Sequence, residues 1–199
     1  APTNCPGTPI AVDITVNPNP DVTATPSATI ICSGSTTDIA LSSTIAGTLY
    51  TWTATGSSGT VTGFSNQATP VAGPIAQTLT NTGNNAATVT YTIMPLFTNG
   101  GITCTGAPTI VVITVNPTPT ATATPTVNLL CSGDATSIAI NSPQAGAIFT
   151  WTVSGATGNV VGESACASNC GNLITQTLSL AVGITTPQTI TYTITPVGP

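Results

Sequence analysis

Six cysteines carry most of the chemistry that this sequence could perform. Cys166 and Cys170 are separated by three residues, a spacing that permits a disulfide within one short loop. The other four recur at a spacing of 99 residues, as Cys5 with Cys104 and as Cys32 with Cys131. The chain contains no His that could complete a metal site with them. Disulfides formed in an oxidising compartment are therefore the favoured interpretation.

The pairing of these four cysteines has two solutions. Two cysteines in each unit of about 100 residues favour a bridge within the unit, from Cys32 to Cys104, with Cys5 and Cys131 pairing with neighbouring repeats. In an immunoglobulin-like strand order, however, these positions can lie at opposite ends of a domain, and the cysteines would then join neighbouring units. A Cα separation above about 7 Å would exclude the bridge within the unit.

The five acidic residues raise the question of calcium, which needs several oxygen ligands brought together. None of these positions is acidic in both repeats, so a calcium site in every linker is not expected. Each acidic residue aligns with an uncharged one: Asp13 with Val112, Asp21 with Thr120, Asp38 with Ser137, Asp134 with Ser35, and Glu163 with Phe64. Solvated surface charge is the expected state of all five.

The 199 residues include no Lys, Arg or His, and the net charge is −5. General acid–base and nucleophilic catalysis need such a group to accept or donate a proton near neutral pH. Nucleic acid needs many cationic contacts. We therefore expect no enzyme, no catalytic, cofactor-binding or metal-binding residue, and no nucleic-acid partner.

The elements that would position these residues are β-strands. Thr, Val and Ile dominate the ordered segments and favour strands, while Gly, Pro and Asn mark turns. Alternation at Val89, Tyr91 and Ile93 gives one polar and one apolar face. Strands are predicted near residues 21–25, 37–43, 49–55, 75–81, 87–95 and 108–116, with equivalents in a second unit. About seven short strands predict a two-sheet sandwich.

Two repeats cover nearly the whole chain. Trp52 recurs as Trp151 and Gln77 as Gln176, both 99 residues later, whereas Tyr91 recurs as Tyr192 after 101 residues. The predicted domains are residues 1–18 as the final strand of a preceding repeat, residues 19–117 as repeat 1, and residues 118–199 as repeat 2 without its own last strand. A Pro-rich spacer at each boundary favours an extended, semi-rigid path.

These predicted domain boundaries have two explanations. The chain is a window from a longer repetitive protein, or separate subunits share a strand by donor-strand addition. Both predict a filament whose partners are neighbouring repeats or subunits.

The few aromatic residues have two interpretations. Trp52, Trp151, Tyr91 and Tyr192 are predicted as core residues, because alternating Thr flanks each of them. Exposed Trp would instead indicate a module that binds surface polysaccharide by stacking.

Several motifs together resemble the PKD-like, immunoglobulin-like tandem repeats of giant Bacteroidetes cell-surface adhesins, the gliding adhesin SprB being a functional analogue. The motifs are Ile31-Cys-Ser-Gly34, Tyr50-Thr-Trp52, Ile75-Ala-Gln-Thr-Leu-Thr-Asn81, Val89-Thr-Tyr91, Cys104-Thr-Gly106 and Thr114-Val-Asn-Pro-Thr-Pro119. The resemblance implies all-β sandwich domains in a linear array, type IX secretion, a cell-surface location and an adhesive or structural filament. No apolar run is long enough to span a membrane as a helix, so membrane insertion is not expected.

Overall fold

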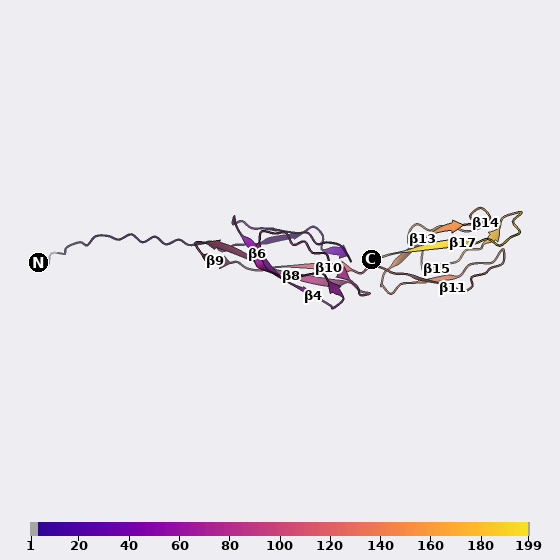
Figure 1. Ribbon diagram of the computed structural model, residues 1–199, viewed down its shortest axis with the longest axis horizontal. Coiled ribbons are helices and arrows are strands. Elements are labelled where there is room, and N and C mark those ends of the chain that lie inside the picture. Colours follow the sequence, from indigo (N-terminus) through magenta and orange to yellow (C-terminus); the bar gives the residue numbers. More distant parts are fainter. Residues whose placement is uncertain (1–3, 199) are drawn as a thin grey trace.

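The computed structural model describes residues 4–198, which contain strands and no helix. No segment among them is a helix of the length and apolar character needed to cross a membrane. Two β-sandwich units follow each other along one long axis, and an extended N-terminal arm precedes them (Figure 1). We keep the names repeat 1 and repeat 2 for these units. The chain is therefore a linear array of all-β sandwich domains.

The larger sheet of repeat 1 places its last strand in the interior. The strand order is β2-β10-β8-β4-β6, with β9 pairing with β8 beyond the end of β10. β10 is antiparallel to β8 and parallel to β2, so it has a neighbour on both sides. The bounds are β2 Ile30–Cys32, β4 Leu49–Gly56, β6 Gln67–Val71, β8 Ala87–Asn99, β9 Ile102–Thr105 and β10 Thr109–Asn116.

The second layer of repeat 1 is built from shorter strands. β1 (Thr23–Pro26) pairs with β3 (Ile39–Ser42), and single bridges extend this pair to the segment around residues 75–78. β5 (Val61–Thr62) and β7 (Thr80–Asn81) close one end. Gly63 lies between the layers with a φ of 91°, and a Cβ there would collide with the backbone oxygen of Thr78. Glycine is required at this turn for both reasons.

The core of repeat 1 follows the predicted alternation. Trp52 and Tyr91 are buried, with exposed fractions of 8% and 0%, and they pack with apolar side chains from both layers. Ile39, Ile75 and Leu79 contribute from the smaller layer. The prediction that Trp52 and Tyr91 belong to the core is confirmed.

Repeat 2 keeps this plan with fewer strands, and within residues 4–198 it has no counterpart of β2, β6, β9 or β10. β13 (Ile148–Gly155) pairs with β17 (Ile190–Val197), and β11 (Thr122–Pro125), β12 (Ile138–Asn141) and β15 (Leu173–Ile174) form the opposing layer. β14 (Val160–Val161) pairs with β16 (Ser179–Leu180). Within residues 4–198, β17 has a partner strand on one side only. β17 is therefore an open edge, whereas its counterpart β8 lies inside a sheet.

The N-terminal arm is extended and almost free of the body. Residues 4–22 form no strand, and the four large apolar side chains at positions 10, 12, 14 and 16 are 78–88% exposed. Among residues 4–19, Asn17 is held to repeat 1 by hydrogen bonds with the carbonyl oxygen and the side chain of Asn99. Four apolar residues that alternate along a solvated strand-like segment are unusual on a stable surface.

Candidate functional site

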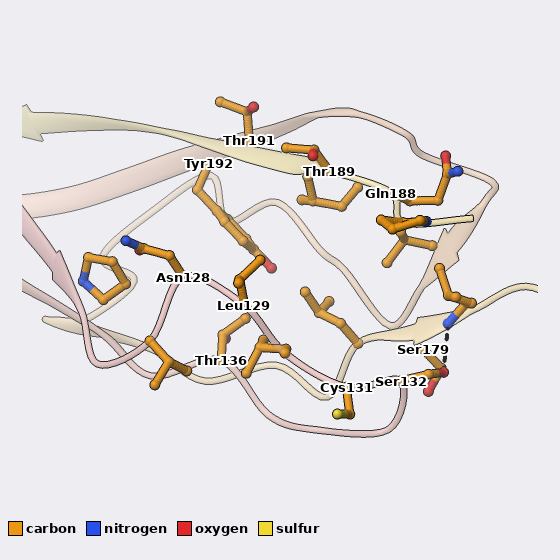
Figure 2. A pocket seen from close by; sticks show the side chains of 18 of the residues that line it. Asn128, Leu129, Cys131, Ser132, Thr136, Ser179, Gln188, Thr189, Thr191 and Tyr192 are labelled. Carbon is orange, nitrogen blue, oxygen red and sulfur yellow. Dashed lines mark hydrogen bonds between the residues drawn. The ribbon is translucent and has the colours of Figure 1, made fainter. Parts of the chain in front are cut away.

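A groove runs along the open edge of repeat 2. Its volume is about 710 Å³, and it lies between β17 and the segment of residues 128–131. Figure 2 shows the ring of Tyr192 directed into this space toward Leu129, while Thr191 points the other way. Its walls carry apolar side chains and uncharged polar ones, and no charged residue.

In repeat 1 the same place is filled by β10. Val111, Ile113 and Val115 point inward from this strand and are 7%, 0% and 0% exposed, whereas Ile110 and Val112 face solvent. The segment of residues 128–131 corresponds to β2, but it forms no strand because it lacks a neighbour with which to pair. The groove thus has the shape left by one missing strand.

The residues around the groove are less buried than their counterparts. Tyr91 and Ile93 are fully buried in β8, but Tyr192 and Ile194 in β17 are only partly buried. Leu129 is 91% exposed. The prediction that Tyr192 is a core residue is therefore fulfilled only in part, whereas Trp151 is 6% exposed and belongs to the core.

A hydrogen-bond network links Tyr192 to Trp151 beneath the groove. The Tyr192 hydroxyl donates to Oε1 of Gln176 at 2.7 Å, and Nε2 of Gln176 donates to the carbonyl oxygen of Ser164 at 2.8 Å. The indole Nε1 of Trp151 donates to the same carbonyl at 3.1 Å. Burial raises the pKa of the Tyr192 phenol, and the charge of nearby Glu163 raises it further.

Repeat 1 contains the same network around Gln77. Tyr91 donates to Oε1 of Gln77 at 3.0 Å, and Gln77 and Trp52 both donate to the carbonyl of Ser65. Burial raises the pKa of the Tyr91 phenol. Sequence reasoning identified the recurrence of Gln77 as Gln176 but assigned it no role. Its fixed spacing from both Trp and Tyr was the available signal.

A second polar centre joins the two repeats. Gln144 is buried; its Oε1 accepts hydrogen bonds from the backbone and hydroxyl of Thr120 and from Ser142, and its Nε2 donates to Oδ1 of Asn84 at 3.3 Å. A small cavity of about 160 Å³ lies beside this contact, between Asn116 and Ala145. Nothing in the sequence pattern had singled out Gln144, because Ile45 occupies its place in repeat 1.

Asp21 anchors a loop of repeat 1 that corresponds to the loop anchored by Gln144 in repeat 2. Its Oδ1 accepts hydrogen bonds from the hydroxyl of Ser43 and from the backbone and hydroxyl of Thr44. The bond from Ser43 and then those from Thr44 hold the pKa of Asp21 below its ordinary value of 3.8. Asp21 is therefore a loop anchor as well as a solvated charge.

The remaining carboxylates do not gather. Asp13 is exposed on the arm, Asp38 is exposed at the start of β3, and Asp134 accepts a hydrogen bond from the backbone of Cys131. Oε2 of Glu163 is buried and has no hydrogen-bond partner. Among residues 4–198, no three Cys, Asp or Glu side chains come close enough to share a metal ion.

The structure answers the pairing question in part. Cys166 and Cys170 form a disulfide with a Cα separation of 5.8 Å, as predicted from their spacing. The predicted bridge from Cys32 to Cys104 is wrong, because both are free thiols. Cys32 lies opposite Asn116 at the last residue of β10, while Cys104 lies in β9 before β10 begins. A strand of eight residues at about 3.3 Å per residue holds them roughly 20 Å or more apart.

Cys5 and Cys131 are also free and exposed. The alternative in which cysteines join neighbouring units thus stays open for four thiols: Cys5, Cys32, Cys104 and Cys131. These thiols are of two kinds. Cys32 and Cys131 begin the same Cys-Ser-Gly motif near the start of a repeat, and Cys5 and Cys104 precede the same strand sequence, Ile-Thr-Val-Asn-Pro.

Comparison with known proteins adds the following. A family model described as PKD-like domain matches residues 29–119 and residues 128–199. No curated protein and no solved structure gives a significant match to the chain. The two matched segments correspond to the two sandwiches, and the second match includes β17, which forms one edge of the groove.

Proposed function

Because the chain belongs to the PKD-like domain family, we propose that it is a structural and adhesive repeat segment of an extracellular cell-surface filament. Domains of this kind are typical of extracellular proteins and generally lack catalytic activity. The observation that carries the proposal is the joint at Gln144. A buried side chain that is hydrogen-bonded to both sandwiches favours a spacer that keeps its direction over a freely jointed chain.

The finer proposal is that the filament serves attachment or gliding, as in the adhesins that the repeats resemble. Export by a type IX system accompanies this proposal. Net charge of −5 spread over 199 residues gives weak self-repulsion, which favours lateral contact between filaments and with other surfaces.

Polysaccharide binding by stacking has less support. Trp52 and Trp151 are buried, and their indole nitrogens are already hydrogen-bonded inside the domains. Tyr50 and Phe149 are also buried. Phe64, Phe97 and Tyr192 are the aromatic side chains among residues 4–198 that are not buried, and each is only partly exposed, so little ring surface is open for a sugar to stack on.

Immunogold labelling of intact cells with an antibody against the purified 199-residue chain tests the proposal. We expect label along surface filaments and weaker attachment to glass after deletion of the coding sequence. Label confined to the cell interior would contradict the extracellular assignment. Unchanged attachment and gliding after deletion would contradict the adhesive role.

A further inference from the structure

We propose that residues 10–17 of a second copy of this chain enter the groove of repeat 2 as its missing strand, and that two disulfides between the copies lock the contact. This inference rests on the proposed function, because it states how the filament is built. It concerns the open edge of β17, the exposed arm and the four free thiols, none of which has a strand or disulfide partner within residues 4–198.

The arm has the sequence of the strand that fills this place in repeat 1. Residues 111–117 read Val-Val-Ile-Thr-Val-Asn-Pro, and residues 12–18 read Val-Asp-Ile-Thr-Val-Asn-Pro. The three inward positions of β10 are identical in the arm, at Val12, Ile14 and Val16. A groove shaped for this strand and a free strand with the same inward side chains are therefore present in one molecule.

The register of repeat 1 predicts the docked pairs. Val111 lies opposite Tyr91 and Ile113 opposite Val89 in the antiparallel ladder. Transferred to repeat 2, Val12 of the second copy would lie opposite Tyr192, and its neighbours two residues away would lie opposite Ile190 and Ile194. All three acceptor residues line the groove. The incoming strand would also give the unpaired side of β17 a partner.

Charge and geometry agree with this register. The single charge of the strand, Asp13, takes the place of Val112, which faces solvent in repeat 1. The arm already lies extended along the long axis, on the side of repeat 1 remote from repeat 2 (Figure 1). Pro9 and Pro18 flank it and limit the conformations lost on docking. Copies would therefore add head to tail along one axis.

Docking brings the first pair of thiols to one joint. In repeat 1, Asn116 at the end of β10 lies opposite Cys32, so Asn17 of the second copy would lie opposite Cys131. Within its own chain Asn17 is held to Asn99 by hydrogen bonds of 3.2 Å and 2.8 Å.

Asn99 belongs to the hairpin of β8 and β9 that carries Cys104. Cys131 of one copy would therefore meet Cys104 of the next.

The second pair meets at the joint between repeat 1 and repeat 2. Cys104 pairs across from Phe97, so Cys5 of the second copy would pair across from Gly198, which occupies the place of Phe97 in repeat 2. A Cβ on Gly198 would lie 3.9 Å from the carbonyl oxygen of Pro117.

Pro117 follows Asn116, the residue opposite Cys32. Cys32 of the first copy would therefore meet Cys5 of the second. Cys5, Cys32, Cys104 and Cys131 of a copy inside the filament would then each have a partner.

Bond formation requires an oxidant, which we take to be a disulfide compound that exchanges with thiols. The thiolate of one cysteine attacks a sulfur of this compound and releases one of its thiols. The thiolate of the partner cysteine then attacks the mixed disulfide and releases the second thiol. One protein disulfide forms, the compound is reduced by two electrons, and the two protons of the cysteine thiols leave with the released thiols.

Assembly of the purified 199-residue protein tests the inference, with oxidised glutathione as the disulfide compound. We expect oligomers in light scattering that grow with concentration. We also expect a ladder in non-reducing gels with steps of 19.6 kDa, which collapses on reduction. Peptide mapping should find Cys131 joined to Cys104 and Cys32 joined to Cys5. A protein that stays monomeric at millimolar concentration overturns the proposal.

Two arm variants make the test specific, and neither endangers folding because the arm is solvated. Ile14→Asp places a carboxylate at an inward position and should weaken association by at least about 100-fold. Thr15→Asp places the same charge at the neighbouring outward position and should leave association within about threefold. Equal effects of the two variants would overturn the docking register.

The mass of the denatured, reduced protein from cellular filaments shows whether the strand in the groove comes from a second copy or from the same chain. A mass near 19.6 kDa supports docking between copies. A much larger mass overturns it, because the strand would then follow β17 within one chain. A larger mass would leave the proposed filament function intact. Conversely, polymerisation in solution together with absence of the protein from the cell surface would contradict the proposed function but not the docking.

Discussion

Gln144 of repeat 2 donates a hydrogen bond from Nε2 to Oδ1 of Asn84 in repeat 1, at 3.3 Å. The amide also anchors Thr120 and Ser142 on its own side of the joint. One side chain thus connects the direction of the spacer to the packing of the second sandwich. This arrangement distinguishes two kinds of variant at the same joint.

Asn84→Ala removes only the bond between repeats, and Gln144→Ala also leaves the Thr120 amide and the Ser142 hydroxyl without their acceptor. We expect Asn84→Ala to broaden the distribution of angles between repeats with unchanged stability. Gln144→Ala should do the same and also destabilise repeat 2 by about 1–2 kcal/mol. Small-angle X-ray scattering measures the angles, and thermal unfolding measures the stability. Equal stability of the two variants would contradict this role of Gln144.

The network beneath the groove predicts a cost for losing Gln176. Gln176→Ala removes the acceptor for the Tyr192 hydroxyl and the backbone amide of Ser164, so repeat 2 should lose about 1–3 kcal/mol. Tyr192→Phe removes one donor only and should cost about 1 kcal/mol. Denaturant unfolding followed by Trp151 fluorescence, in a Trp52→Phe background, reports repeat 2. A larger loss in Tyr192→Phe than in Gln176→Ala would refute the assignment of Gln176 as the centre of the network.

Asp21 predicts acid sensitivity of one loop in repeat 1. Because its pKa is lowered in the folded state, its contribution is present above the ordinary value of 3.8 and is lost as pH falls through the lower, folded value. Hydrogen exchange of the Thr44 amide should accelerate beyond the intrinsic rate change between pH 5 and pH 2. The corresponding loop of repeat 2, held by the uncharged Gln144, serves as the internal control and should not respond. Asp21→Asn should abolish the pH response.

Glu163 occupies the place of Phe64, which packs against the core of repeat 1. Its Oε2 is buried without a partner, an arrangement that costs about 1–3 kcal/mol. Glu163→Phe should therefore raise the unfolding free energy of repeat 2 by about 1 kcal/mol or more. It should also lower the pKa of Tyr192 by removing a nearby charge. Absorbance at 295 nm during alkaline titration measures that pKa, and Glu163→Gln separates the charge from the packing.

The disulfide of repeat 2 takes the place of an edge strand. Cys166 and Cys170 lie where β6 has Gln67 and Val71, and both pair with β13 through backbone hydrogen bonds. Replacing both cysteines by Ser should destabilise repeat 2 by about 2 kcal/mol in the chain-entropy model for so short a loop. Thermal unfolding should show repeat 1 unchanged. A fall in the melting temperature of both repeats would contradict a local role.

Alternation and repetition predicted most of the strands, because period-two patterns such as Val89, Tyr91 and Ile93 report which face is buried. The segment of residues 75–81 is predicted as one strand but forms only β7 and isolated bridges at Ile75 and Thr78. The cysteine pairing could not be predicted from spacing. It depends on the direction of β10 between Cys32 and Cys104, which only the sheet order reveals.

The polar centres escaped prediction for a different reason. A side-chain amide such as Gln144 acts through three-dimensional neighbours and leaves no period in the sequence. The groove was anticipated only as a missing strand in the repeat frame. Its depth and the exposure of Leu129 follow from packing.

The parallel pairing of β2 with β10 has a consequence for a protein pulled from both ends. The chain enters repeat 1 at one pole and leaves it at the other, after Asn116. Tension along the axis would draw β2 and β10 past each other lengthwise, so their ladder of hydrogen bonds shares the load and must break together. The same geometry in repeat 2 would resist traction only after a strand has filled its groove.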